Sequence, residues 1–379
     1  MTDEQGMMLR LLRFSFWGEA DSGELWTACD WTDVLRQAER QSIHGLVAKA
    51  IHSLNDHGAF GEVDEALAGR CLTTEFALLN SNMQVNGVLR EVVQLLQADR
   101  QQPLLLKGQG VAQCYPIAGL RMAGDIDLYL DDVDRAVSLL RKHEPDCTFD
   151  DSCPRHSKMQ LRGIDIELHR YLVDRQPGRI YQVVTRLQQE ERSRSQAVSI
   201  DDVKVLTPSP LLNAFFLFQH FRQHFLHDSI GLRQVCDWML YLHAHHHEID
   251  VEQLRAALKE SRLLYDWRCF GSIVVNYLGL PASEFPLYDG RHRLMSGWIL
   301  RQILRFGHKG YARRRKEIAE KGVRQTFRLL QTFTEPYLCN LVLCPRRGFA
   351  QLCYLYLSAI KCEALYWLLS KRMHAATSS

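Results

Sequence analysis

The chain has 379 residues, more than a typical single domain, which predicts two or three domains. Apolar residues make up 46% of it and charged residues 24%, values that argue against a disordered chain. The formal net charge of +2 gives no reason to expect wholesale nucleic-acid binding, so any basic site must be local.

The eleven cysteines are odd in number, and none stands in a Cys-x-x-Cys pair. With neither a zinc framework nor a disulfide pattern, the sequence favours reduced thiols in a cytoplasmic protein without disulfide partners. The N-terminus lacks the basic, apolar and small-residue segments of a signal peptide. Because polar residues interrupt the apolar stretch 349–369, we expect an amphipathic helix there rather than a membrane span.

Residues 1–100 are expected to form an N-terminal helical region that supports the rest of the chain. Apolar residues recur there at helical spacing, and Asp30 is placed as the N-cap of one helix. The expected helices cover 7–17, 31–41, 44–54 and 63–98, with a loop at 55–61. No residue pattern in this region points to chemistry.

A core at residues 101–206 begins with a strand that runs into a glycine turn. The apolar segment 103–106 precedes Lys107 and Gly108, and residues 111–115 look like the first turns of a helix. Backbone N–H groups at such a helix start can hold an anion, and Lys107 adds a positive charge. The sequence therefore predicts an anion-binding turn.

The central pattern of the core is the strand around Asp125 and Asp127. Successive strand side chains point to opposite faces, so these two carboxylates share one face and Ile126 and Leu128 share the other. Adjacent carboxylates repel each other unless a cation lies between them. Because Mg²⁺ is bound by one or two carboxylates together with substrate phosphates, the pattern indicates a magnesium site.

A hairpin that turns near Gly163 should supply a third carboxylate. On its second arm Asp165, Glu167 and His169 alternate with apolar residues and share a face. Asp165 and Glu167 are both candidates from this pattern alone.

The other elements of the core carry no predicted chemistry. Asp131 and Asp132 indicate the start of a helix that runs to His143, rather than metal ligands. The further expectations are a weak strand at 147–150, a surface helix at 179–194 and a closing strand at 199–206.

Residues 207–379 are expected to form a larger C-terminal helical region. His220 and His224 lie four residues apart, on one face of a strongly aromatic helix at 211–226. Such a pair can bind zinc, pack as a structural pair or contact a substrate phosphate. The structural pair is favoured, because no Glu accompanies the histidines as it does in His-Glu-x-x-His.

Three further polar patterns follow in this region. Arg233 and Asp237, four residues apart, indicate an intrahelical ion pair. The histidines at 243–247 favour a solvated surface. The basic run 305–316 is either a solvated face, which we favour, or a grip on RNA or polyphosphate.

Together these residues resemble a known family. The matching residues are Leu106-Lys107-Gly108, Tyr115, Arg121, Asp125-Ile126-Asp127-Leu128, Glu167-Leu168-His169 and the segment 232–238. They look like the uncharacterised bacterial nucleotidyltransferase family with a helical C-terminal half, within the DNA polymerase beta superfamily. One departure is that the superfamily has Gly-Gly or Gly-Ser in the phosphate turn, where this chain has Lys107-Gly108 and so lacks the serine hydroxyl.

The resemblance implies an α+β fold: a small mixed nucleotidyltransferase sheet with flanking helices, between the two helical regions. It implies two Mg²⁺ ions, with Mn²⁺ as an alternative, held by the catalytic residues Asp125, Asp127 and Glu167. It favours Glu167 over Asp165. It places Lys107, Gly108 and Arg121 on the nucleotide, although Arg121 is as well suited to an ion pair with a local acid. The implied substrate cleft consists of His169, His220, His224, Arg233 and Asp237.

The implied function is Mg²⁺-dependent transfer of a nucleoside monophosphate from an NTP, ATP by default, to an acceptor hydroxyl. The acceptor is a small molecule, a protein or an RNA end, and no membrane is involved. One alternative is a non-catalytic, nucleotide-binding regulatory or antitoxin-like protein of the same fold, and another is an interaction module with structural acids. For the enzyme, Asp127→Asn should abolish transfer and leave the melting temperature equal or higher.

Overall fold

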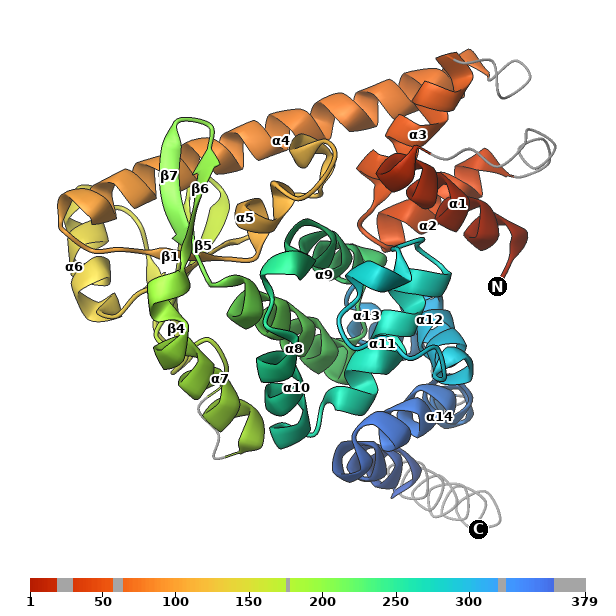
Figure 1. Ribbon diagram of the computed structural model, residues 1–379. Helices are drawn as coiled ribbons and strands as arrows, with labels where there is room; N and C mark the ends of the chain where they lie inside the picture. The colour runs from red at the N-terminus through yellow and green to blue at the C-terminus, as the bar shows by residue number, and fades with distance from the viewer. Residues whose placement is uncertain (19–29, 57–63, 175–177, 320–324, 358–379) are drawn as a thin grey trace, which may run out of the picture.

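The computed structural model describes residues 1–18, 30–56, 64–174, 178–319 and 325–357 (Figure 1). A seven-stranded sheet lies beside a helical C-terminal half, and the helices of the N-terminal region adjoin both. This is the predicted α+β arrangement. Most of the expected loop 55–61 lies outside the described residues. So does the part of the expected helix 349–369 that follows residue 357, while its described part is helical.

The described residues of the N-terminal region form four α-helices, as predicted. They are α1 (Asp3–Trp17), α2 (Trp31–Arg40), α3 (His44–Asp56) and α4 (Glu65–Ala98). The Asp30 side chain accepts hydrogen bonds from the backbone N–H groups of Thr32 and Asp33, which confirms the expected N-cap. Gly18 ends α1 in the left-handed conformation.

The long helix α4 connects the N-terminal helices to the sheet (Figure 1). Its first half packs against α3. Its second half contributes Val85, Leu89, Val92 and Leu96 to the core on one face of the sheet. Helix α4 therefore holds the sheet at a fixed distance from the N-terminal helices.

The sheet has the strand order β3-β4-β5-β2-β1-β7-β6. Its strands are β1 (Leu104–Leu106), β2 (Ile126–Tyr129), β3 (Phe149–Asp150), β4 (His156–Leu161), β5 (Ile164–His169), β6 (Gln196–Ile200) and β7 (Val203–Thr207). Strand β2 is antiparallel to β1 and parallel to β5, so the sheet is mixed. Strands β1 and β2 lie in the interior of the sheet, where each pairs with a strand on both sides.

Two tight turns set the edges of the sheet. Arg162 and Gly163 both have positive φ, the pattern of a two-residue hairpin turn, and they join β4 to β5 where the sequence predicted it. The prediction of a single closing strand at 199–206 was wrong. Asp201 takes a left-handed conformation and splits this segment into the antiparallel strands β6 and β7. A short polar residue tolerates that conformation, so no glycine marked the turn.

Helices α4 and α6 (Val133–His143) share an apolar core with one face of the sheet. The other face is turned toward the helical half, where α5 (Gly108–Ala112) and α7 (Arg179–Glu190) also pack. Asp132 caps α6 by accepting from the backbone N–H of Arg135, and Asp131 pairs with Arg192. Asp132 therefore has the role predicted for the start of a helix, whereas Asp131 has a structural role of another kind, in an ion pair.

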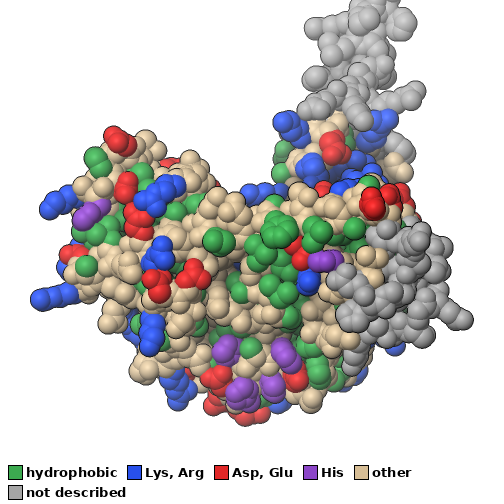
Figure 2. All heavy atoms as spheres, turned by 90° about the horizontal axis from the view of Figure 1, so that it is seen from above, with side chains coloured by type: hydrophobic (Ala, Val, Ile, Leu, Met, Phe, Trp, Pro, Cys, Tyr) green, Lys and Arg blue, Asp and Glu red, His purple; other side chains and the backbone are tan. Residues whose placement is uncertain are grey.

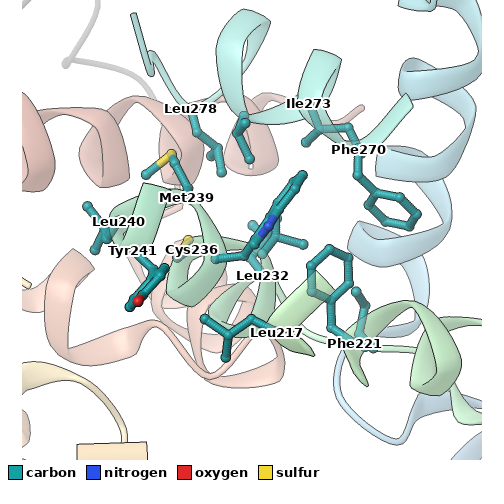
Figure 3. Close-up of a cluster of buried hydrophobic side chains, with 14 of the residues drawn as sticks. Leu217, Phe221, Leu232, Cys236, Met239, Leu240, Tyr241, Phe270, Ile273 and Leu278 are labelled. Atoms are coloured by element: carbon teal, nitrogen blue, oxygen red, sulfur yellow. The ribbon is translucent and has the colours of Figure 1, made fainter. Parts of the chain in front are cut away.

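The helical half contains seven described α-helices before residue 344, and a further helical segment covers the described residues 345–357. The seven are α8 (Pro210–Asp228), α9 (Leu232–His245), α10 (Val251–Glu260), α11 (Leu264–Asn276), α12 (Arg293–Phe306), α13 (Gly310–Ala319) and α14 (Gln325–Leu343). Ser209 caps α8, and Pro210 occupies its first turn. An aromatic core joins α8, α9 and α11, with the Trp238 and Trp267 rings 4.7 Å apart. The rings of Phe221 and Phe270, which Figure 3 labels, lie 5.1 Å apart in the same core.

The surface carries charges of both signs. On the face shown in Figure 2, acidic and basic side chains are interspersed with hydrophobic ones. In the basic run 305–316, Arg305 pairs with Glu335 and Arg314 with Glu317, as expected of a solvated helical face. Among the described helices, none combines the length and apolar composition that a membrane span requires.

Candidate active site

The turn between β1 and α5 points a lysine at the acidic strand. Lys107 and Gly108 both have left-handed φ, +53° and +47°. A lysine rarely adopts this conformation, and such strain concentrates at functional sites. The ammonium of Lys107 lies 3.1 Å from Asp127 Oδ2. Helix α5 begins at Gly108, three residues earlier than the expected 111–115, so Gly108 belongs to the turn and to the helix.

Three carboxylates converge at the junction of β2 and β5. These strands are parallel and pair Asp127 with Glu167, so both side chains project from the same face. Asp125 stands one residue before β2 and is exposed, whereas Asp127 is buried and Glu167 is half-buried. Carboxylate oxygens of the three residues lie within 4.8 Å of one another. An all-oxygen set at this spacing suits a hard divalent cation such as Mg²⁺.

Asp165, the competing third acid, is engaged elsewhere. Its carboxylate lies 2.9 Å from the Lys158 ammonium and accepts a hydrogen bond from Gln160 at 3.2 Å. Both partners stand on β4, the outer neighbour of β5. The structure therefore groups Glu167, and not Asp165, with Asp125 and Asp127.

Cationic neighbours neutralise part of this charge. Burial opposes ionisation of Asp127, but Lys107 and a hydrogen bond with His169 Nε2 at 2.8 Å outweigh it and lower the pKa of that carboxyl. The opposite holds for Asp125, whose pKa is raised first by the charge of Asp127. The site thus favours the ionised form of Asp127 and opposes the ionisation of Asp125.

His169 bridges two of the acids. Burial alone lowers its pKa, but hydrogen bonds to Asp127 and Glu167 outweigh burial and raise it. Its Nε2 lies 3.4 Å from Glu167 Oε2, and this contact is the largest influence that lowers the pKa of Glu167. The expected place of His169 beside the carboxylates is what the geometry shows.

His220 and His224 approach the site from α8. Their rings are 4.6 Å apart, and His220 Nε2 lies 3.3 Å from the Lys107 ammonium. Burial first and Lys107 second lower the pKa of His220, so its neutral ring can accept a hydrogen bond from Lys107. Neither histidine belongs to a metal-compatible group in the part of the chain that the structure describes. The geometry therefore favours a supporting pair over a zinc site.

Arg121 and Asp237 form a buried ion pair. The guanidinium donates to both carboxylate oxygens, with Nε–Oδ1 at 2.8 Å and Nη2–Oδ2 at 2.9 Å, and Tyr115 donates to Oδ1 at 2.6 Å. The remaining guanidinium nitrogen of Arg121, Nη1, donates a hydrogen bond to the Met122 carbonyl. Of the two roles expected for Arg121, this pair favours the ion pair with an acid over a contact with the triphosphate, because Asp237 already engages its guanidinium. The intrahelical pair of Arg233 with Asp237 is replaced by this longer-range pair.

The guanidinium of Arg233 is available instead. Its Nη1 donates to the Met122 carbonyl at 3.2 Å and lies beside Gly124, directly before Asp125. Its Nε is buried without a hydrogen-bond partner, and no carboxylate among the described residues lies within 4.0 Å of it. Burial and then the charge of Arg121 lower its pKa. Arg233 is thus a half-buried cation without a carboxylate partner among the described residues.

One residue of the site escaped the sequence-based search. His156 stands on β4 directly opposite His169, and its Nδ1 lies 3.7 Å from Glu167 Oε2. The hairpin turn could have revealed His156 in the sequence. When residues are paired outward from the turn at Arg162 and Gly163, position 156 falls opposite position 169.

The comparison with known protein families identifies the class of this protein. The chain belongs to the family of uncharacterised nucleotidyltransferases, which it matches over residues 27–269. No curated protein matches the chain. A similar solved structure is an antigenic nucleotidyltransferase-like protein from Paracoccidioides brasiliensis, with 14% identity, 52% of this chain and 92% of that chain covered, and a TM-score of 0.32.

Removal of Asp237 should destabilise the protein strongly. We expect Asp237→Ala to lower the free energy of unfolding by about 3–5 kcal/mol, because it leaves a buried guanidinium unpaired. The double variant Arg121→Met/Asp237→Leu should recover most of this loss in denaturant titrations. The exposed pair of Arg192 with Asp131 is the control, and Arg192→Ala should cost only about 0–1 kcal/mol. A loss from Asp237→Ala no larger than the control's would contradict the structural role.

Asp125 and Asp127 should respond in opposite directions to the loss of charge. The lowered pKa of Asp127 stabilises the fold above the ordinary carboxyl pKa, and this contribution is lost as the pH falls through the lowered value. Asp127→Asn should therefore lower the melting temperature at neutral pH, contrary to the expectation from the sequence. The raised pKa of Asp125 means that its ionised form destabilises the fold, so Asp125→Asn should raise the melting temperature.

Calorimetry between acid and neutral pH checks both signs. The difference between Asp127→Asn and the unaltered chain should shrink in acid, and the gain from Asp125→Asn should disappear below the ordinary carboxyl pKa. Asp131→Asn, at an exposed ion pair, should change the melting temperature little. Shifts of the same sign for Asp125→Asn and Asp127→Asn would refute this charge balance.

Proposed function

We propose that the chain is a Mg²⁺-dependent nucleotidyltransferase that moves a nucleoside monophosphate from an NTP to an acceptor hydroxyl. The observation that carries the proposal is the pairing of Asp127 with Glu167 across β2 and β5. It joins three carboxylates at one point beside the Lys107–Gly108 turn. Membership of the nucleotidyltransferase family supports the reaction class.

Asp125, Asp127 and Glu167 are the residues that would hold the divalent cations. Their oxygen-only donor set fits Mg²⁺, with Mn²⁺ as an alternative. A pair of such ions about 3.5–4 Å apart stabilises the entering and leaving oxygens of an in-line displacement at phosphorus. The lowered pKa of Glu167, which results first from its hydrogen bond with His169, keeps this carboxylate ionised, so it can also accept the acceptor's proton.

Lys107 and Arg233 would bind the triphosphate from two sides. The Lys107 ammonium lies 3.1 Å from Asp127 Oδ2 and 3.3 Å from His220 Nε2, at the turn that leads into α5. Arg233 lies beside Gly124, and a guanidinium can bind phosphate oxygens through paired N–H groups. Together these cations compensate for the serine hydroxyl that this turn lacks.

ATP is the default nucleotide, and the acceptor belongs to one of three classes: a small molecule, a protein or an RNA end. We also propose a cytoplasmic location. Every cysteine in the described part of the chain is free, which fits a reducing compartment.

Transfer should depend on Asp125. With each triphosphate labelled at its α-phosphate, in the presence of Mg²⁺ and candidate acceptors, Asp125→Asn should lower the transfer rate by more than about 100-fold. Asp165→Asn is the matched control, since it changes an acid on the same sheet face that pairs with Lys158, and its rate should stay near that of the unaltered chain. Nucleotide binding without transfer would support a regulator, and absence of both would refute the proposal.

Arg233 should contribute mainly to nucleotide binding. Arg233→Met removes charge-assisted hydrogen bonds to phosphate and should raise the KM for the NTP about 10- to 100-fold, with a smaller effect on kcat. Arg192→Met, at an exposed ion pair, is the control and should leave KM unchanged. An unchanged KM for Arg233→Met would remove Arg233 from the triphosphate site.

A further inference from the structure

A second group of donor atoms lies next to the three carboxylates. His156 on β4 and His169 on β5 face each other in the hairpin, with ring centroids 5.2 Å apart. His156 Nδ1 lies 3.7 Å and His169 Nε2 lies 3.4 Å from the same oxygen, Glu167 Oε2. The donor atoms of the three residues lie within 4.8 Å of one another. Two imidazole nitrogens and a carboxylate thus surround one point.

Hydrogen bonding does not account for the position of His156. Its Nδ1 is buried and has no hydrogen-bond partner, and 3.7 Å is too long for a hydrogen bond to Glu167. A buried polar atom without a partner is costly, and native structures contain few of them. A cation between His156 Nδ1 and Glu167 Oε2 would satisfy both atoms.

The donor types select the kind of ion. Mg²⁺ prefers oxygen ligands, whereas imidazole together with carboxylate suits Zn²⁺ and its neighbours. Three protein ligands are enough for Zn²⁺ and leave one position open. We propose that His156, Glu167 and His169 form a binding site for a Zn²⁺-class ion, distinct in its donor set from the Asp125–Asp127–Glu167 group.

Asp127 adjoins this site, because its Oδ1 lies 2.8 Å from His169 Nε2, but it belongs only to the group of three carboxylates. Glu167 belongs to both groups of donors. Bound Zn²⁺ therefore withdraws Glu167 from the carboxylate group, and Zn²⁺ should inhibit nucleotidyl transfer even in excess Mg²⁺.

Co²⁺ is a suitable probe, because its visible absorption reports a tetrahedral site. The titration uses the full chain without nucleotide, in a background where His245, His246 and His247 are changed to Gln, since this surface cluster can also bind the ion. We expect saturation at one equivalent of Co²⁺. In the same background, His156→Gln should abolish the absorption and weaken Zn²⁺ binding in calorimetry by more than the 10- to 100-fold typical of second-shell changes.

The matched control is His44→Gln, because His44 Nδ1 is also buried without a partner but lies outside the group. It should leave Co²⁺ binding intact. The inference would be overturned if the Co²⁺ absorption persisted in His156→Gln. It would also be overturned if the change of His245, His246 and His247 to Gln removed the absorption by itself. X-ray absorption at the zinc edge of the surface-variant protein needs no change at His156. Two imidazole nitrogens are expected there, and an oxygen-only shell would overturn the inference as well.

The same titration separates this inference from the proposed function. Asp125 is not a ligand of the second group, so Asp125→Asn should keep the Co²⁺ absorption while it loses nucleotidyl transfer. A chain that transfers nucleotides but binds no Co²⁺ at His156 refutes only the zinc site. A chain that binds Co²⁺ there but transfers nothing refutes only the proposed function.

Discussion

The parallel pairing of β2 with β5 is the constraint on which the site depends. It places Asp127 next to Glu167 on one face of the sheet, while the alternate residues of the same strands fill the core beneath α4 and α6. This arrangement gathers like charges in a largely buried place, which is unfavourable unless cations compensate. Lys107 and His169 supply that compensation at 3.1 and 2.8 Å from Asp127. Lys107 has a positive φ, which is a strained conformation for a lysine, and in this conformation its ammonium reaches the acids.

The helical half is part of the site as well as its support. Helix α8 presents His220, which contacts Lys107, and α9 presents Asp237 and Arg233. Through Asp237, α9 holds Arg121 immediately before the acidic strand, so the position of β2 is tied to the C-terminal helices. This tie explains why Arg233, one turn away on the same helix, lies next to Gly124 with its guanidinium available. The two halves therefore have to pack correctly before the site is complete.

Some errors of the sequence-based analysis have a common cause. The expected intrahelical pair of Arg233 with Asp237 failed because local spacing cannot reveal a stronger partner 116 residues away in the chain. The same ion pair engages the guanidinium of Arg121, which the family resemblance had placed on the triphosphate. The split of the closing strand at Asp201 and the early start of α5 at Gly108 depended on left-handed backbone at an aspartate and a lysine. Such conformations are held by their surroundings, so composition does not reveal them.

The sequence by itself determined the helix cap at Asp30, the β4–β5 hairpin and the shared face of Asp125 and Asp127, because alternation and capping are local properties of the chain, and its family resemblance implied the α+β class. Only the tertiary structure decided which third acid joins them. Glu167 and Asp165 have the same orientation along β5, and Lys158 on the neighbouring strand pairs with one of them. Tertiary structure alone also paired Arg121 with Asp237 and placed His156 opposite His169. These outcomes depend on which distant groups meet, and a one-dimensional pattern does not contain that information.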